Sequence, residues 1–308
     1  MVKQLRRNPL RRESHAPEHK KMTLTEIMKK HGIQAAGIPF GSCRLTRGYK
    51  LRRVGFEPRS VYFGLIPYYT RECDLPRSVS AYAVSKDYHL FIEETGALIE
   101  KEAKEAFPGA GFAVFGDSSP FDERDGAARA GLGVIGRNGM LITEKYSSYV
   151  FIFEIVSDVP PDREPVEPGR CPGCGRCAAA CPFGMTGENC LSAITQKKGG
   201  LDEKEKETVL RYGSVWGCDI CQEVCPYTAA AKKAGTIYTD IPFFTGTALR
   251  FPDEKTLADS DDFAQRAYSW RPKDVILRNI RLFEEHGTSP RANPDEGSGG
   301  REAPETNT

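Results

Sequence analysis

Residues 171–182 read CPGCGRCAAACP, and this stretch decides the fold of the 308-residue chain. Its spacing, C-x2-C-x2-C-x3-C-P, is typical of iron–sulfur proteins, in which three thiolates on a short loop hold one cluster and the fourth cysteine ligates another. Four further cysteines follow at Cys190, Cys218, Cys221 and Cys225, the last before Pro226. Eight thiolates therefore predict two [4Fe–4S] clusters with four ligands each.

A crossed assignment of the ligands follows from the spacing rule. Zinc sites more often use two separated C-x2-C pairs, and a disulfide framework needs an oxidising compartment, so both alternatives are disfavoured. Cys190 stands alone between the motifs, and a free buried thiol remains an alternative for it. Cys43 and Cys73 match no ligand role. The predicted ligand sets are Cys171, Cys174, Cys177 and Cys225 for one cluster, and Cys181, Cys190, Cys218 and Cys221 for the other.

Composition points to a soluble chain that can bury one large core or two modest ones, with 39% hydrophobic and 28% charged residues. No apolar run approaches the length of a membrane span.

Residues 1–21 hold seven of the 43 Lys and Arg residues. We interpret them as a disordered basic tail, with an RNA-contacting arm as an alternative. No apolar segment follows its arginine pairs, which excludes twin-arginine export, and we expect a cytoplasmic protein.

Hydrophobic periodicity predicts alternating strands and helices upstream of the cysteines, hence an α/β layer. A helix within 22–37 is expected to start at a Thr23 or Thr25 cap and to stop at Gly32. Residues 139–143 and 149–157 look like paired strands. The other expected strands are 33–41, 60–69 and 111–115, and the other helices are 87–106, 121–130, 201–213 and 262–285.

The predicted domain order places an α/β domain at 22–165 before a cluster domain at 166–286. Residues 158–170 are rich in proline and acidic residues and are interpreted as a linker. From 287 to 308 the Gly/Ser/Pro/Glu-rich chain is expected to be disordered.

The loop at 131–136 has the form G-x-G-x-x-G but does not predict a dinucleotide site. That fingerprint needs a strand before it and a helix after it. Here an expected helix precedes the loop and a strand-like run follows, so the glycines are interpreted as allowing tight turns or close approach by another group.

Several segments together resemble the epoxyqueuosine reductases, cobalamin-dependent iron–sulfur enzymes of tRNA modification. The resemblance covers about residues 33–285. It includes Tyr149 to Glu154, Cys190-Leu191-Ser192, Trp270 and Leu277-Arg278-Asn279. The remaining segments are YAVSKDYH at 82–89, Asp117-Ser118-Ser119-Pro120 with Glu123-Arg124, AGLGVIGRN at 130–138, the first cysteine motif, TQKKG at 195–199 and GCDICQEVCP at 217–226.

The resemblance implies a nitroreductase-like cobalamin-binding domain followed by a ferredoxin-like double [4Fe–4S] domain. It also implies reduction of epoxyqueuosine in tRNA to queuosine by cob(I)alamin, to which the two clusters feed electrons from a low-potential donor. Family members usually continue into C-terminal helical HEAT-like repeats that help to grip tRNA, whereas only a disordered tail is expected here after about residue 286. No membrane partner is expected.

Asp117, after a predicted strand, matches the family's proposed proton donor. Stacking against an apolar corrin would raise the pKa of this carboxyl. The alternative is that Asp117 caps the helix expected at 121–130. His89 is not expected to ligate cobalt. Further candidates for cofactor binding are Asp87, Tyr88, Ser192, Thr195, Gln196, Asp219 and Gln222, some of which could instead simply hydrogen-bond cluster sulfurs.

Two other functions compete with this one. A two-cluster electron carrier would need no large domain upstream of the cysteines. A cobalamin-dependent reductase could also act on another substrate, as in reductive dehalogenation or the reductive activation of a corrinoid protein.

Overall fold

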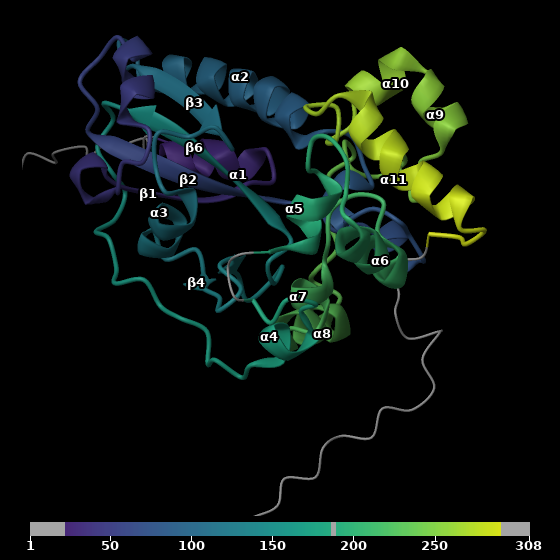
Figure 1. Cartoon of the computed structure of the whole chain (residues 1–308). Helices are drawn as coiled ribbons and strands as arrows, with labels where there is room; N and C mark the ends of the chain where they lie inside the picture. Colours follow the sequence, from purple (N-terminus) through teal and green to yellow (C-terminus); the bar gives the residue numbers. More distant parts are fainter. Residues whose placement is uncertain (1–21, 186–188, 291–308) are drawn as a thin grey trace, which may run out of the picture.

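A four-stranded antiparallel sheet forms the centre of the first half of the protein (Figure 1). The computed structural model describes residues 22–185 and 189–290. The expected mixed α/β class is confirmed, although every neighbouring strand pair is antiparallel. The strand order is β1 (Gln34–Pro39), β2 (Ser60–Pro67), β6 (Val150–Ser157) and β3 (Phe112–Gly116).

Helices cover both faces of the sheet because its central strands are apolar on both sides. α1 (Leu24–Lys30) and α2 (Tyr88–Ala106) share a buried cluster with Tyr62, Phe153 and Ile155. The opposite face carries Phe63 and Val156 and packs against α3 (Glu123–Arg129). A Cβ at Gly126 would collide with the Phe63 ring, so a glycine lets α3 approach the sheet closely.

Two element boundaries differ from the sequence-based expectation. The first helix starts at the expected Thr23 cap, which forms a capping box with Glu26, but it ends at Lys30 because Gly32 adopts φ +76°. The single helix expected over 262–285 is instead two, α10 (Ser260–Ala264) and α11 (Lys273–Glu285). Pro272 lies directly before α11 and disfavours helical backbone in the residue that precedes it.

The G-x-G-x-x-G loop contains β4 (Val134–Ile135), which pairs with β5 (Leu141–Ile142). The expectation that residues 139–143 pair with 149–157 was therefore wrong, because β6 is already occupied by β2 and β3. A Cβ at Gly133 would lie 2.6 Å from the carbonyl oxygen of Ile142. Close approach of the hairpin partner thus accounts for this glycine.

The cysteine-rich half is helical, and its helices lie below and to the right of the sheet in Figure 1. Four short 3-10 helices occur in the first half: η1 (Phe40–Ser42), η2 (Gly48–Arg53), η3 (Arg71–Asp74) and η4 (Ala81–Ala83). The remaining helices are α4 (Arg176–Ala180), α5 (Leu191–Thr195), α6 (Glu203–Tyr212), α7 (Ile220–Glu223), α8 (Pro226–Ala234) and α9 (Glu254–Ala258).

The two halves share one buried hydrophobic cluster, which runs from α1 to α11. The segment 158–170 has no regular secondary structure and lies along the first half. Asp162 accepts a hydrogen bond from the Gly37 backbone N–H, and the Arg163 side chain donates to the Ala130 carbonyl. The predicted linker is therefore attached to the sheet domain by specific contacts.

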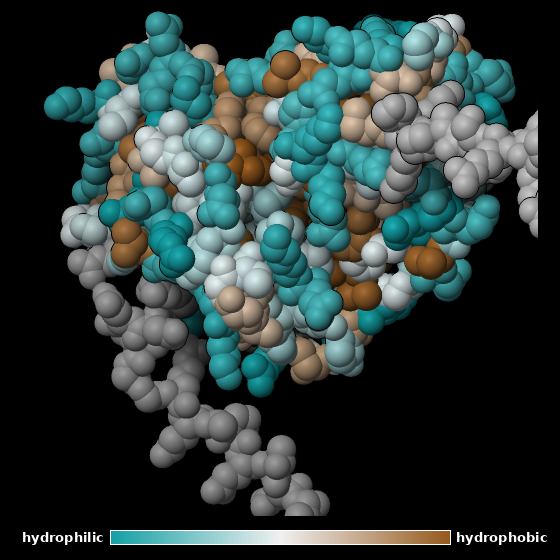
Figure 2. Space-filling model, turned by 180° about the vertical axis from the view of Figure 1, so that it is seen from behind, coloured by the Kyte–Doolittle hydropathy of each residue, from teal (hydrophilic) through white to brown (hydrophobic). Residues whose placement is uncertain are grey.

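The surface seen in Figure 2 is mainly hydrophilic, and hydrophobic residues appear in small groups between polar side chains. Across the described residues, no helix combines the length and apolar character needed to cross a membrane. The tail predicted at 1–21 and residues 291–308 of the tail predicted at 287–308 lie outside the described residues.

Candidate active site and cluster-binding region

Five cysteine thiols line one cavity of about 130 Å³, between the loop that precedes α4 and the start of α8. They are Cys171, Cys174, Cys177, Cys221 and Cys225. The first three come from the C-x2-C-x2-C loop, and Cys221 and Cys225 come from the second motif. The crossed assignment gives Cys221 to the other cluster, and it stays a prediction. Within the described residues, no three His, Cys, Asp or Glu side chains converge on a single metal ion. Thiols arranged around a cavity instead fit a multi-iron cluster.

Hydrogen-bond donors reach the cluster-cavity sulfurs from the loop after β4. The Arg137 backbone N–H donates to Cys171 Sγ at 3.3 Å, and Asn138 Nδ2 lies 3.9 Å from Cys221 Sγ. Such donors stabilise thiolates and shift the reduction potential of a cluster. The residues that follow the glycine loop therefore serve the cysteine site.

The other three motif cysteines, Cys181, Cys190 and Cys218, form a second neighbourhood with Cys221. Burial raises the pKa of Cys221 to about 11, and the nearby Cys190 and Cys181 thiols contribute to the increase. Burial likewise raises the pKa of Cys218, with contributions from Cys221 and Cys190. The predicted second ligand set is thus close together in space, with Cys221 between the two sets. Cys43 and Cys73 lie outside both groups, and burial raises the pKa of each.

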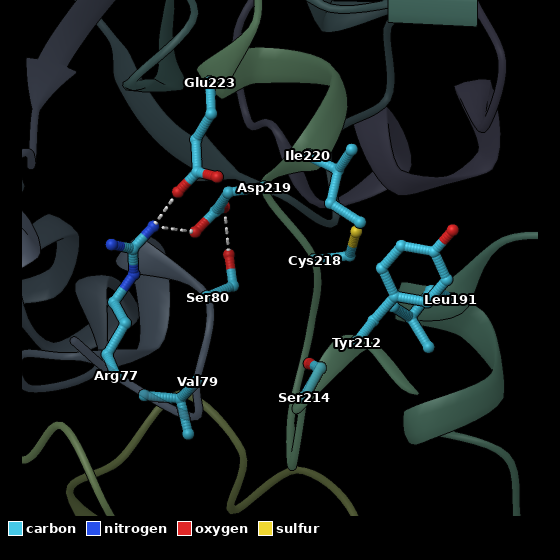
Figure 3. Close-up of a pocket in the computed structure, with 10 residues that line it drawn as sticks. All are labelled: Arg77, Val79, Ser80, Leu191, Tyr212, Ser214, Cys218, Asp219, Ile220 and Glu223. Atoms are coloured by element: carbon cyan, nitrogen blue, oxygen red, sulfur yellow. Dashed lines mark hydrogen bonds and ion pairs between the residues drawn. The ribbon is translucent and has the colours of Figure 1, made fainter. Parts of the chain in front are cut away.

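A buried ionic network holds the segment between Cys218 and Cys225 (Figure 3). The Arg77 guanidinium donates to Asp219 Oδ2 at 2.9 Å and to Glu223 Oε1 at 2.5 Å. Asp219 also accepts from the Ser80 hydroxyl and, at 2.6 Å, from the Ala81 backbone N–H. Asp219 is 6% exposed, so the network excludes solvent from the base of the second motif.

Three of the predicted cofactor-binding residues are buried and engaged in contacts within the protein. Asp219 belongs to the Arg77 network, and Gln222 bonds the Ser148 hydroxyl at 2.9 Å. The Thr195 hydroxyl donates to the Ser192 carbonyl and accepts from the Gly217 N–H. These contacts favour the alternative role of supporting the cysteine loops, and cofactor contact by these three residues stays a prediction.

Ser192 and Gln196 lie together beside Tyr82. Gln196 Nε2 donates to Ser192 Oγ at 2.9 Å and to Tyr82 OH at 3.4 Å, and Trp216 Nε1 also donates to Tyr82 OH. No donor among the described residues bonds Gln196 Oε1, so a half-buried acceptor remains available. Free amide and hydroxyl groups of this kind fit the amide side chains around a corrin ring.

Tyr82 connects the cluster half to the acidic site. Its pKa is raised first by burial, and the carboxylates of Asp219, Asp87 and Asp117 contribute. Asp87 and Asp117 are therefore near the same hydroxyl that Gln196 contacts. Tyr82 is the first residue of the segment YAVSKDYH, on which the family resemblance rests, but the sequence did not single it out as a site residue.

Asp117 lies in a strained turn at the end of β3. Its φ is +51°, unusual for a residue other than glycine, and the Ser118 N–H bonds the Gly116 carbonyl across it. The cap of α3 is Asp122, whose side chain accepts from the Asp125 N–H. The alternative of Asp117 as a helix cap is therefore wrong. Its side chain is 63% exposed and free to meet a ligand.

His89 bridges two carboxylates. Its Nδ1 lies 2.8 Å from Asp87 Oδ1, and its Nε2 lies 3.7 Å from Asp117 Oδ2. Asp117 and then Asp87 raise the pKa of His89 to about 9, while His89 lowers the pKa of Asp117. The pKa of Asp117 is lowered because an imidazolium faces the carboxylate and the side chain is largely solvated. The raised pKa expected for this carboxyl when it stacks against a corrin stays a prediction.

Tyr88 packs its ring on Phe151 at a centroid distance of 3.8 Å and an interplanar angle of 11°. Asp87 caps α2 by accepting a hydrogen bond from the His89 N–H. Both residues thus help to fix the start of α2, and with it the His89 ring.

Two further carboxyls, the half-buried Glu123 and the buried Glu154, lie near Asp117. Burial raises the pKa of Glu123 to about 7, and the nearby negative charge of Asp117 adds to this increase. Burial raises the pKa of Glu154 well above its usual value. Glu154 stands on β6 between Phe63 and Phe115 and is fully buried. Sequence periodicity did not reveal this pair, because Glu154 interrupts an otherwise apolar strand.

Comparison with known proteins agrees with this arrangement. Residues 170–228 match the family model of the 4Fe-4S double cluster binding domain. An epoxyqueuosine reductase from Leadbetterella byssophila is 33% identical over 233 residues, which cover 73% of this chain and 74% of the relative. The chain belongs to the epoxyqueuosine reductase family. The predicted double-cluster domain and the family resemblance are therefore confirmed.

The match varies in extent among epoxyqueuosine reductases. The Listeria monocytogenes relative is 32% identical over 210 residues, which span 64% of this chain and 54% of the relative. A solved epoxyqueuosine reductase with an epoxyqueuosine-modified tRNA-Tyr stem loop aligns over 85% of this chain and 80% of its own, with a TM-score of 0.68 and 24% identity. An epoxyqueuosine reductase structure from Streptococcus thermophilus gives a TM-score of 0.63 at 21% identity, covering 84% and 79% of the two chains. These structural matches confirm the fold.

Proposed function

We propose that this protein reduces epoxyqueuosine in tRNA to queuosine, using cobalamin and two [4Fe–4S] clusters. The reaction takes two electrons and two protons, opens the epoxide to an alkene and releases its oxygen as water. The observation that supports it most is the exposed Asp117–His89 pair beside Tyr82, which also contacts the cluster half through Gln196 and Trp216. Family membership supplies the substrate class.

In this proposal residues 22–165 bind cobalamin and carry out catalysis, and residues 166–286 hold the two clusters. The first cluster is assigned to Cys171, Cys174, Cys177 and Cys225, and the second to the other four cysteines. A low-potential donor would supply electrons one at a time. Thiols of this number need a reducing compartment, so we include a cytoplasmic location in the proposal.

Bound cobalamin would supply the strongly reducing centre that the amino acids lack. Ser192 and Gln196 would contact its amide groups, with Asp87 and Tyr88 near its rim. Asp117 would donate a proton to the departing oxygen, and His89 would hold the next proton within 3.7 Å. An exposed acid can meet the substrate directly, and covering it would raise its pKa toward the working range.

The test is anaerobic turnover by the full chain, loaded with clusters and cobalamin, of an epoxyqueuosine-modified anticodon stem loop. Dithionite supplies electrons, and mass spectrometry follows the nucleoside. Conversion to queuosine is the expected result. A protein that binds cobalamin but leaves this RNA unchanged would act on another substrate, and one that only exchanges electrons would be a carrier.

A further inference from the structure

The first cluster site reaches the surface at Cys174. This residue is exposed, whereas Cys171, Cys177, Cys221 and Cys225 on the same cavity are half-buried. The loop leads into α4, which lies at the lower edge of the molecule in Figure 1, far from α9 and α10. An electron could therefore enter at this edge from outside the protein.

Three exposed arginines belong to this cavity or adjoin its cysteines in the chain, and are here called the arginine patch: Arg137, Arg170 and Arg176. Arg137 lines the cluster cavity itself. Arg170 directly precedes Cys171, and Arg176 stands between Cys174 and Cys177, so chain connectivity keeps both near the thiols.

The charge of the arginine patch is not neutralised by the protein. No ion pair or side-chain hydrogen bond engages these three arginines within residues 22–185 and 189–290. Residues 168–187 also contain no Asp or Glu. Several basic side chains elsewhere are paired with acids, for example Lys197 with Glu205 and Arg281 with Glu254. An uncompensated positive surface around an exposed thiol attracts a negatively charged partner.

We propose that the arginine patch is the docking surface for an acidic, low-potential electron-carrier protein, which reduces the cluster at Cys171, Cys174, Cys177 and Cys225. This inference deepens the proposed function by assigning its electron entry point. In each encounter a flavin hydroquinone anion on the carrier loses one electron and becomes the neutral semiquinone, and no proton is taken up or released. The cluster passes from the 2+ to the 1+ state, and no covalent bond forms between the two proteins.

A protein carrier fits the position of the patch better than RNA does. Arginines also bind RNA phosphates. Here, however, Arg137 lines the cluster cavity and the other two stand next to ligand cysteines in the chain, so a bound RNA would block access to Cys174. The acidic site that would meet the substrate is built from β3 and α2 instead.

The experiment measures cluster reduction by stopped-flow absorbance, in the cluster-reconstituted full chain without cobalamin. The probe is an acidic flavodoxin in its hydroquinone state. Replacing Arg137, Arg170 and Arg176 by Glu should lower the second-order rate constant at least about 10-fold at low ionic strength, and the difference should largely vanish near 1 M salt. The matched control carries Arg52→Glu, Arg53→Glu and Arg59→Glu, three exposed arginines that do not line the cluster cavity, and should keep the wild-type rate.

A second electron donor distinguishes weaker docking of the carrier protein from damage to the cluster. Reduced methyl viologen is a cation, so its rate with the patch variant should not fall. Calorimetry with oxidised flavodoxin should show a weaker Kd for the patch variant alone. Equal rates and equal Kd values for wild type, patch variant and control would overturn the inference, as would loss of stem-loop binding with unchanged flavodoxin kinetics. Turnover of the modified stem loop with dithionite tests the proposed function independently of this docking.

Discussion

The His89 ring lies between two carboxylates, and this placement determines which of the three groups holds a proton. Asp117 and Asp87 raise the pKa of His89 from 6.5 to about 9, and the pKa of Asp117 falls below 3.8. The histidine contribution to stability is full below pH 6.5 and is lost as the pH rises through about 9. The Asp117 contribution is present above pH 3.8 and is lost as the pH falls through its lowered pKa.

We expect the His89 imidazole to titrate with a midpoint near 9 in the cobalamin-free protein. Asp117→Asn should move the midpoint downward, because one of the two carboxylates that stabilise the imidazolium is removed. NMR of the ring protons measures both values. Glu57→Gln changes an exposed carboxylate elsewhere and should leave the midpoint in place. A wild-type midpoint near 6.5 would contradict the geometry of this pair.

Asp117→Asn should also lower kcat about 100-fold or more, since an amide cannot deliver the proton that a positioned carboxylic acid delivers. Single-turnover assays on the modified stem loop measure this loss. Iron content and cobalamin affinity of the variant should match those of the wild type. Full turnover by Asp117→Asn would exclude this residue as the proton donor.

At the scale of elements, Arg77 joins the loop after η3 to α7, which carries the second cysteine motif. Arg77 is 5% exposed. Its partners Asp219 and Glu223 therefore depend on it for their charge balance. Any change that removes the guanidinium leaves two carboxylates in a poorly solvated region next to Cys218.

Arg77→Met should destabilise the protein by about 3–5 kcal/mol, the usual cost of breaking a buried ion pair from one side. Denaturant unfolding of the apoprotein, followed by circular dichroism, measures the change. Arg281→Ala removes an exposed pair with Glu254 and should have little effect on the midpoint. If both variants unfolded alike, the Arg77 network would not hold the two elements together.

The sequence predicted helices and strands well where the hydrophobic periodicity was clear or a helix-capping residue was present. The spans of α2 and β2 and the Thr23 cap agree with expectation. Strand pairing was less predictable, because an apolar run such as β6 reads the same whether it pairs with β5 or lies between β2 and β3. The break before α11 depends on Pro272, which periodicity alone did not weigh.

The candidate site likewise combines features that could be predicted from the sequence with features that could not. Cysteine spacing predicted four thiols for the first cluster, and these four line one cavity together with Cys221, which the prediction gave to the second cluster. The environment of Asp117 could not be predicted, because its pKa depends on His89, which lies 28 positions earlier and is brought close by folding. Thr195, Asp219 and Gln222 look available in sequence but are engaged inside the fold.

For the whole molecule, the crossed ligand sets predict which cysteine variants lose the same cluster. Cys174→Ser and Cys225→Ser should each lower the iron content from about eight to about four per chain and remove the same EPR signal. Cys181→Ser should remove the other signal. Iron analysis and EPR of the reduced protein measure both effects.

Cys43→Ser is the matched control, since Cys43 lies outside both cysteine groups and should leave the iron content unchanged. If Cys225→Ser and Cys181→Ser removed the same cluster, the ligand sets would not be crossed.

The central claim is that this chain joins two clusters to a corrinoid at the junction of its two halves. Anaerobic EPR of the cluster-reconstituted protein, titrated with cob(II)alamin, tests it most directly. We predict a shift from the free to a base-off spectrum that saturates near one equivalent, with no nitrogen signal from His89, which is not expected to ligate the cobalt. An unchanged cob(II)alamin spectrum beside two reducible clusters would contradict the claim and leave an electron carrier.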